Sequence, residues 1–265
     1  MSTNVTQPQM VLITGASSGI GKALAHTFAE NGFDVILVAR RKKKLEQVEQ
    51  DIKKQYGQMA YSLAVDLADP SSPQFIFDHC QKQGWHVDAL VNNAGYALNN
   101  NFLDSSWQDH RAFLQVLNIS VVELCHLFAP AMKDNGYGRI LNIASVAAWL
   151  PQLKGNLYNA AKSFILDFTQ AIDLELHPHG VYCTALCPGL TFSEFHDVMG
   201  TRGSVRKLPR FVWMTAEEVA QEGFDALMEG KPVHVNGLVN QGLSQMMSMM
   251  PSSVKQFIAK QQKVM

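Results

Sequence analysis

The sequence predicts an α/β fold: a doubly wound, Rossmann-type parallel sheet of about seven strands in a single domain, with helices on both faces. Short apolar, β-branched runs alternate with longer amphipathic segments along almost the whole chain, which is typical of parallel strands joined by helices. No linker, repeat or low-complexity stretch divides the 265 residues. One large domain therefore accounts for the whole pattern.

The apolar runs and the amphipathic segments follow one another in strict order. The predicted strands are 10–14, 34–39, 60–65, 89–92, 139–144, 181–187 and 233–235. The predicted helices are 20–31, 42–56, 72–83, 107–133, 157–177 and 215–229. Right-handed crossovers between successive parallel strands would wind this order into a doubly wound sheet.

Three segments lie outside this rhythm. Residues 1–9 are predicted to be a polar tail, before a catalytic domain that spans 10–237. Residues 190–213 have no clear period, and a loop of this length favours a substrate lid. Residues 238–265 form a Met-rich extension with apolar residues at helical spacing, interrupted by Pro251. We expect this extension to dock on the core or on another subunit; an amphipathic membrane-surface helix is the alternative.

Composition narrows the classes of function. With 47% hydrophobic and 17% charged residues, the chain is typical of a globular protein, and a net charge of −1 gives no reason to expect nucleic acid as a partner. The four cysteines lie in apolar segments without metal-like spacing, so we expect reduced, packed thiols and no metal site. We see no signal-peptide pattern and no run near about eighteen apolar residues, so the cytoplasm is the expected location.

A glycine-rich turn joins the first strand to the first helix. Thr14 to Gly21 reads Thr-Gly-Ala-Ser-Ser-Gly-Ile-Gly, with glycines that let the backbone approach a pyrophosphate at a helix N-terminus. The spacing differs from the common Gly-x-Gly-x-x-Gly pattern, but the position between a strand and a helix predicts a dinucleotide site. The residues expected at the cofactor here are Gly15, Ser17, Ser18, Gly19, Ile20 and Gly21.

The ends of the next strands predict which dinucleotide is bound. At the end of the second strand, where NAD enzymes carry an acidic residue, this chain has Ala39 followed by Arg40, a guanidinium suited to the 2′-phosphate of NADP. NADP (as NADPH) is therefore the expected cofactor, and NAD is less favoured. Asp66, with Leu67 beside it, is predicted to accept a hydrogen bond from the adenine amino group, or else to start a turn. Small residues after the fourth strand predict backbone close to the cofactor at Asn92, Ala94 and Gly95.

Tyr158 and Lys162 are the candidate catalytic pair. Four residues apart on a predicted helix, they share one face, and a cation beside a phenol lowers the pKa of the phenol. A phenol that exchanges its proton near neutral pH suits general acid-base catalysis. Ser145, thirteen residues before Tyr158, ends the fifth strand.

These motifs together resemble the short-chain dehydrogenase/reductase (SDR) family over nearly the whole chain. The matching set is Thr14-Gly15-x-x-x-Gly19-x-Gly21, Asn92-Asn93-Ala94-Gly95, Asn118, Ser145, Tyr158-x-x-x-Lys162 and Pro188-Gly189. The resemblance implies that Tyr158 exchanges a proton with the substrate oxygen, that Ser145 holds this oxygen, and that Lys162 lowers the pKa of the tyrosine and binds the nicotinamide ribose. Asn118 would anchor a water that relays protons to Lys162.

The resemblance also implies contacts at the two ends of the cofactor. Pro188, Gly189 and Thr191 would bracket the nicotinamide, and Ser17 would help Arg40 to hold the 2′-phosphate. The chain would then be an oxidoreductase that transfers a hydride between NADP(H) and a carbonyl or secondary alcohol. The alternative is an NADP-binding redox sensor or scaffold without turnover.

The expected substrate is apolar or bulky, because aromatic and aliphatic residues flank the site in sequence: Phe192, Phe195 and Phe211 in the lid, and Trp149, Leu150 and Leu153 after the serine. The long tail departs from the shorter ending typical of the family. Both a homodimer and a homotetramer therefore stay open.

Overall fold

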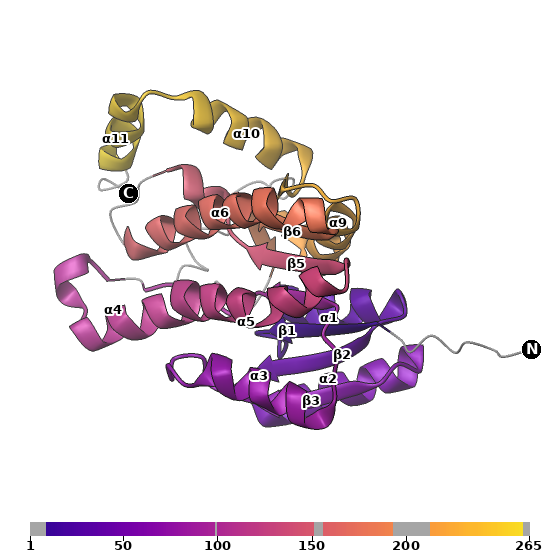
Figure 1. Cartoon of the computed structure of the whole chain (residues 1–265). Helices are drawn as coiled ribbons and strands as arrows, with labels where there is room; N and C mark the ends of the chain where they lie inside the picture. The colour runs from indigo at the N-terminus through magenta and orange to yellow at the C-terminus, as the bar shows by residue number, and fades with distance from the viewer. Residues whose placement is uncertain (1–8, 99, 151–155, 193–212, 262–265) are drawn as a thin grey trace, which may run out of the picture.

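Seven parallel strands form the central sheet in the order β3-β2-β1-β4-β5-β6-β9 (Figure 1). This computed structural model describes residues 9–98, 100–150, 156–192 and 213–261. The strands are β1 (Met10–Thr14), β2 (Asp34–Ala39), β3 (Ala60–Ala64), β4 (Ala89–Asn92), β5 (Gly138–Ile143), β6 (Val181–Cys187) and β9 (Val233–Val235). Each lies within one residue of its predicted bounds, so the doubly wound fold is confirmed.

The direction of winding reverses at β1. Leu12 of β1 is aligned with Ile36 of β2 on one side and with Leu90 of β4 on the other. The crossovers that leave β1 and β4 therefore run to opposite sides of the sheet. In such folds the crevice at the carboxyl ends of these strands is where ligands bind.

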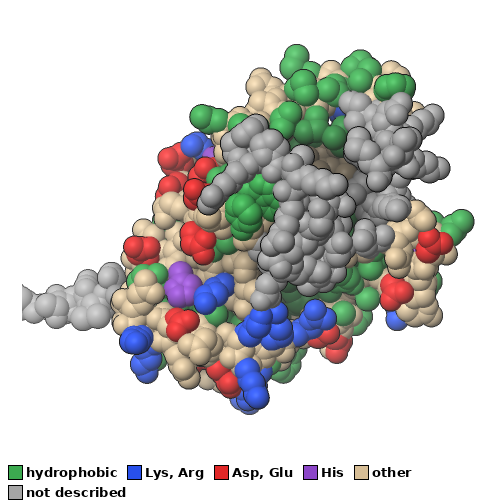
Figure 2. Space-filling model, turned by 180° about the vertical axis from the view of Figure 1, so that it is seen from behind, with side chains coloured by type: hydrophobic (Ala, Val, Ile, Leu, Met, Phe, Trp, Pro, Cys, Tyr) green, Lys and Arg blue, Asp and Glu red, His purple; other side chains and the backbone are tan. Residues whose placement is uncertain are grey.

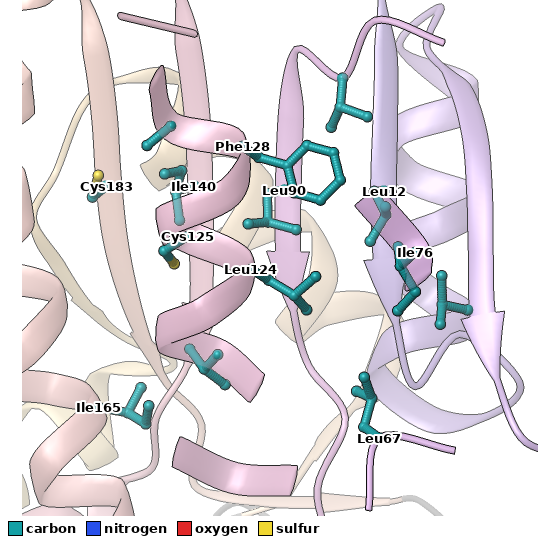
Figure 3. Close-up of a cluster of buried hydrophobic side chains, with 14 of the residues drawn as sticks. Leu12, Leu67, Ile76, Leu90, Leu124, Cys125, Phe128, Ile140, Ile165 and Cys183 are labelled. Carbon is teal, nitrogen blue, oxygen red and sulfur yellow. The ribbon is translucent and has the colours of Figure 1, made fainter. Parts of the chain in front are cut away.

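Helices cover both faces of the sheet. One face carries α1 (Gly19–Glu30), α2 (Lys42–Tyr56) and α9 (Ala216–Met228), and the other carries α3 (Ser72–Gln83), α5 (Ser120–Asp134) and α6 (Asn156–Leu176). Figure 3 shows the second layer, where Leu124 and Phe128 of α5 face Leu90 of β4. The inner strands β1, β2, β4, β5 and β6 are buried on both faces, so their sequences are largely apolar, whereas the edge strands β3 and β9 are only partly buried.

The predicted helix 107–133 contains a wider turn. Helix α4 (Trp107–Leu114) continues through a π-helical turn, η2 (Gln115–Ile119), into α5. The combined helix is long and apolar enough to cross a membrane by length and composition, but 61% of its most apolar window is buried in the protein. This burial is typical of a helix in the core of a protein. The π turn lies between α4 and α5.

The two irregular regions differ in how far the structure describes them. The ends of segment 190–213 form a small parallel sheet of β7 (Leu190–Phe192) and β8 (Trp213–Thr215). The rest of the predicted lid, with Phe195 and Phe211, lies outside the described residues, as do Leu153 and most of the N-terminal tail. The C-terminal extension forms α10 (Leu238–Met249) and α11 (Ser252–Gln261), interrupted at Pro251 as predicted.

All four cysteines are buried and free, in agreement with the prediction of packed thiols. Within the described ranges, no group of three or more His, Cys, Asp or Glu residues is placed to hold a metal ion.

Candidate active site

The glycine turn after β1 forms a cradle with no room for side chains. Gly15 and Gly19 have φ values of 67° and 54°, which glycine adopts without strain. A Cβ added at Gly21 would lie 2.4 Å from the carbonyl oxygen of Gly15. Helix α1 begins directly after this turn, and its first turn contains no acidic residue. Its N–H groups and positive end therefore suit an anionic group such as a pyrophosphate.

Arg41, not Arg40, contacts the serines of this turn. The Nη2 of Arg41 donates hydrogen bonds to Ser17 Oγ (2.9 Å) and Ser18 Oγ (2.6 Å), and its Nε donates a third to Ser17 Oγ (3.2 Å). Arg40 turns toward Asp66, with 3.9 Å between Nη1 and Oδ2, and both side chains are well exposed. Ser17 thus contacts Arg41, and its expected role beside Arg40 at the 2′-phosphate stays a prediction. Adjacent residues at a strand end point in different directions, and Arg41 is the one that faces the turn.

Asn93 braces the glycine turn from β4. Its Nδ2 donates to the carbonyl oxygens of Thr14 (2.9 Å) and Gly15 (3.4 Å). The backbone N–H groups of Asn93 and Ala94 donate to Thr14 Oγ1, which in turn donates to the Val91 carbonyl. These bonds lock the ends of β1 and β4 together. Gly95 follows at the exposed edge of the crevice.

The Asn92 side chain does not line the crevice. It is buried, and its Nδ2 donates to Asn142 Oδ1 (2.9 Å) and to the Cys125 sulfur (3.4 Å). Alternation along β4 explains this result, because Asn92 and Asn93 point to opposite faces of the strand. The Asn92 side chain therefore makes core contacts, and the expected approach of its backbone to the cofactor stays a prediction.

Asp66 and Leu67 divide between surface and core. Asp66 is exposed after β3, where its Oδ1 accepts a bond from the Ala68 N–H (3.0 Å) and fixes the turn. Leu67 is buried in the core, and its carbonyl accepts a bond from Ser120 Oγ (3.2 Å). Asp66 therefore remains able to accept a further bond from a ligand, beside Arg40.

Ser145 and Tyr158 meet at the carboxyl end of β5. Ser145 follows this strand and is buried, and its Oγ accepts a hydrogen bond from the Ala147 N–H (3.1 Å). A hydrogen bond joins the Ser145 and Tyr158 side chains. Burial raises the pKa of the Tyr158 phenol to about 12, and the Ser145 contact offsets only part of this rise. The two hydroxyl groups converge as expected, but in the protein alone the phenol is a weaker acid than the sequence suggested.

Lys162 lies one turn further along α6 and is buried. Its Nζ donates to the carbonyl oxygen of Ile143 (2.6 Å) and lies 5.7 Å from the centroid of the Tyr158 ring. Burial lowers the pKa of the ammonium to about 8, and the neighbouring Cys187 thiol offsets this slightly. The cation is directed at a backbone carbonyl, so the expected lowering of the tyrosine pKa is not found in the protein alone.

Asn118 lies in the π turn and reaches toward the same helix. Its Nδ2 donates to the carbonyl oxygen of Ala161 (3.0 Å), one residue before Lys162. Its Oδ1 is buried and accepts no hydrogen bond from the described protein groups. Single π turns occur frequently at functional sites. Here the π turn presents a buried acceptor next to the Lys162 segment.

The segment after β6 closes the site. The Pro188 carbonyl accepts a bond from the Val146 N–H (3.0 Å), which ties this segment to η3 (Val146–Trp149), the turn after Ser145. Thr191 is buried, and its Oγ1 donates to the Gly189 carbonyl (3.2 Å). A Cβ added at Gly189 would lie 2.4 Å from the Asn240 Nδ2 of α10. Helix α10 thus packs directly against the segment predicted to bracket the nicotinamide.

Sequence reasoning did not assign roles to four residues of this site. Arg41, Asn93 and Cys187 adjoin predicted residues, and the alternation of side chains at strand ends is the feature that could have identified them. Asn240 lies in the extension, about fifty residues after Gly189. Its contact depends on the path of the chain, and no local pattern indicates it.

Comparison with known proteins places this geometry in a family. A family model described as short chain dehydrogenase matches residues 9–201. The NADP-dependent 3-hydroxy acid dehydrogenase YdfG of Escherichia coli strain K12 is 30% identical over 232 residues, covering 86% of this chain and 91% of the relative. Sulfoacetaldehyde reductase 2 of Chromohalobacter salexigens is 31% identical over 232 residues, covering 86% and 90%.

Solved structures agree with these relatives. A short-chain dehydrogenase from Sphingobium yanoikuyae in complex with NADPH superposes with a TM-score of 0.80 at 28% identity, covering 92% of this chain and 96% of that one. The bulky-bulky ketone specific alcohol dehydrogenase from Comamonas testosteroni gives a TM-score of 0.77 at 25% identity, covering 93% and 96%. The chain therefore belongs to the short-chain dehydrogenase family and is an oxidoreductase of that family.

Proposed function

We propose that this chain transfers a hydride between NADP(H) and a carbonyl compound or secondary alcohol, with Tyr158 as the general acid and base. The observation that carries the proposal is the meeting of the Ser145 and Tyr158 hydroxyl groups above the buried Lys162 ammonium. Ser145 follows β5 and the glycine turn follows β1, so both lie at the edge of the sheet formed by the carboxyl ends of its parallel strands. The glycine turn suits phosphate groups, and the paired hydroxyl groups suit proton transfer.

The choice of NADP(H) rests on charge at the end of β2. The strand ends at Ala39 without a carboxylate, and Arg40 and Arg41 follow it. The Arg41 guanidinium is held beside the first turn of α1 by Ser17 and Ser18, where a 2′-phosphate would find a cation and two hydroxyl groups. The NADP dependence of the E. coli relative and the NADPH complex of the Sphingobium neighbour support this choice.

Bound NADP(H) would supply or accept the hydride at the carbon of the substrate. During reduction, the Tyr158 phenol gives its proton to the carbonyl oxygen as the new C–H bond forms, and Ser145 donates a hydrogen bond to the same oxygen. During oxidation, the phenolate takes the proton of the alcohol. With a pKa of about 12, Tyr158 is protonated at neutral pH and ready to act as the acid.

Lys162 and Asn118 would support this proton transfer. The Lys162 ammonium stabilises the phenolate that forms when Tyr158 loses its proton. The buried Oδ1 of Asn118 would anchor a water molecule that relays protons to Lys162, and its lack of a partner among the described groups supports this role.

We further propose an apolar or bulky carbonyl substrate. Phe192 of β7 stacks on Trp213 of β8 with ring centroids 4.7 Å apart, and Trp149 packs against the core after Ser145. The Comamonas neighbour, which is specific for bulky-bulky ketones, supports this substrate class. The names of the two bacterial relatives, by contrast, indicate small acidic substrates.

A substrate panel tests the reaction and the substrate class together. Purified protein with NADPH is offered aryl alkyl ketones, short 3-oxo acids and sulfoacetaldehyde, and the loss of NADPH absorbance is followed. We expect the highest kcat/KM with the ketones. A preference for the acids would retain the reaction and overturn the substrate class. No turnover across the panel, despite tight NADPH binding, would instead favour a non-catalytic NADP-binding protein.

We also propose a cytoplasmic homo-oligomer, a homodimer or a homotetramer. Four buried free thiols fit a reducing compartment. Ile119 and Phe164 are about half exposed and line a shallow hollow between α5 and α6, a surface suited to a second copy. Light scattering on the purified protein measures its molar mass and so distinguishes a monomer, a dimer and a tetramer.

A further inference from the structure

Helix α10 presents its apolar residues to the outside. Its two buried residues, Asn240 and Ser244, are polar. Asn240 donates to the Asn236 carbonyl (2.9 Å) and packs on Gly189, and Ser244 Oγ donates to the Gln241 carbonyl (2.9 Å). The exposed large residues are Leu238, Val239, Leu243, Met246 and Met249. This arrangement is the reverse of a surface helix in a globular protein, which turns its apolar stripe inward.

Helix α11 continues this surface. Val254 and Phe257 are 41% and 63% exposed, and the backbone N–H groups of Val254 and Lys255 donate to the Pro251 carbonyl, within the same extension. Hydrophobic side chains gather at the top of Figure 2, the end of the molecule where α10 and α11 lie in Figure 1. We call the exposed apolar residues of these two helices the tail patch. An accumulation of exposed apolar side chains of this kind indicates an interaction site.

The charge of the extension indicates what the tail patch meets. Residues 238–265 contain no aspartate or glutamate, and their three charged side chains are Lys255, Lys260 and Lys263, although the whole chain has a net charge of −1. Apolar residues combined with lysines alone are typical of helices that lie in the interface of a membrane with anionic lipids. A second copy of the extension would add three more lysines and no carboxylate to pair with them.

We propose that α10 and α11 bind this protein peripherally to an anionic lipid surface. The leucine, methionine and phenylalanine side chains enter the boundary between headgroups and acyl chains, and Lys255 contacts the lipid phosphates. Because Asn240 of α10 packs on Gly189, the tail patch lies on the outer face of a helix that covers the segment after β6. The proposal stands independently of the reaction that the site performs.

Vesicle sedimentation with the full-length protein tests this proposal. We expect binding to vesicles of phosphatidylcholine mixed with phosphatidylglycerol, little binding to phosphatidylcholine alone, and weaker binding as salt is added. Leu243→Glu with Met246→Glu should abolish binding to the mixed vesicles. Lys255→Gln should weaken it about fivefold. The matched control is Leu174→Glu, which changes a leucine that is 80% exposed on α6 and should bind as wild type does.

Each outcome of this test decides for or against the proposal. We expect the double variant Leu243→Glu, Met246→Glu to oxidise NADPH with a soluble carbonyl as fast as wild type does. This result would show that the variant is folded and that lipid binding is separate from the proposed reaction. Equal binding to both kinds of vesicle, or equal binding by wild type and this variant, would overturn the proposal. Absence of vesicle binding by wild type, with a smaller oligomer in the variant, would assign the patch to a second copy instead.

Discussion

The Nζ of Lys162 donates a 2.6 Å hydrogen bond to the carbonyl oxygen of Ile143, the last residue of β5. This bond connects the catalytic helix to the strand that carries Ser145. It also directs the ammonium at a backbone dipole, 5.7 Å from the centroid of the Tyr158 ring. Burial raises the pKa of the phenol and lowers the pKa of the ammonium, so it favours the neutral form of each group. Their cooperation therefore depends on what binds between them.

Removing the phenol oxygen tests the proton donor. Tyr158→Phe should lower kcat for carbonyl reduction about a hundredfold to ten-thousandfold, because no other described side chain at Ser145 can donate the proton. The dissociation constant of NADPH, measured by fluorescence titration, should change little. Tyr61→Phe, at a tyrosine in the core, is the matched control. Full activity of Tyr158→Phe would remove Tyr158 from the reaction.

The pH dependence of reduction should report Lys162. Below its pKa of about 8 the ammonium is charged and stabilises the phenolate that forms, and above that pH the charge is lost. We expect kcat/KM for NADPH, which reports the free enzyme, to fall by up to about tenfold per pH unit above pH 8. Lys162→Arg should remove this decline whatever its absolute activity, because a guanidinium stays protonated.

The exposed lysine of α5 provides the control for this pH profile. Lys133→Arg should leave the decline near pH 8 in place, since Lys133 lies far from the catalytic helix in the sequence and is exposed. A decline that persists unchanged in Lys162→Arg would assign it to another group.

The strands and most of the site could be predicted because local pattern determines them. The run Asp34–Ala39 is apolar on both faces and ends at arginines, so its bounds and its basic end follow from sequence alone. Which arginine faces the glycine turn does not follow, because one residue reverses the direction of a side chain at a strand end. The Arg41 contacts with Ser17 and Ser18 needed the three-dimensional position of α1.

Two other features depend on contacts between distant elements. The periodicity of 107–133 does not reveal the π turn around Asn118. The wider turn goes together with a contact to another helix, the hydrogen bond from Asn118 to the Ala161 carbonyl of α6. The side chains of Tyr158 and Lys162 do share a helix face, as their spacing predicts. Where the ammonium points is determined by Ile143, which lies on a separate strand.

Arg41 should distinguish NADPH from NADH. Arg41→Ala removes the guanidinium held by Ser17 and Ser18, and losing a charge-assisted bond to a phosphate costs about 1.5–3 kcal/mol, or roughly tenfold to a hundredfold in NADPH affinity. NADH affinity should stay nearly unchanged. Lys42→Ala, at the next exposed residue, is the matched control. A larger loss from Arg40→Ala than from Arg41→Ala would restore the prediction made from the sequence.

The contact between Gly189 and Asn240 should couple α10 to the active site. Gly189→Ala places a methyl group against the Asn240 amide and should break its bond to the Asn236 carbonyl, lowering the free energy of unfolding by about 1–3 kcal/mol and raising KM for NADPH. Adding Asn240→Ala to Gly189→Ala should recover part of both losses. Gly242→Ala, on the open side of the same helix, should leave KM for NADPH unchanged and stabilise the helix by about 0.5–1 kcal/mol. Additive effects in the double variant would show that the contact carries no coupling.

Buried thiols should make the protein less stable in alkali. Burial raises the pKa values of Cys80, Cys125 and Cys187 from 9.0 to about 12, and it raises that of Cys183 as well. Below pH 9 these thiols are protonated in both states. Between pH 9 and 12 the unfolded chain loses protons that the folded protein keeps, so the free energy of unfolding falls as pH rises.

Lys162 acts in the opposite direction over part of this range. Its pKa is lowered from 10.5 to about 8, so between these values the folded protein loses the proton first, and stability from this group rises with pH. Each group contributes at most about 1.4 kcal/mol per pH unit, so one lysine offsets about one of the four thiols and the net change is a loss. Urea unfolding at a series of pH values measures the slope. Cys80→Ala should make this slope shallower by about one proton, whereas the packing lost in the variant lowers stability equally at every pH. A stability that stays flat from pH 9 to 11 would show that the thiols ionise in the folded protein.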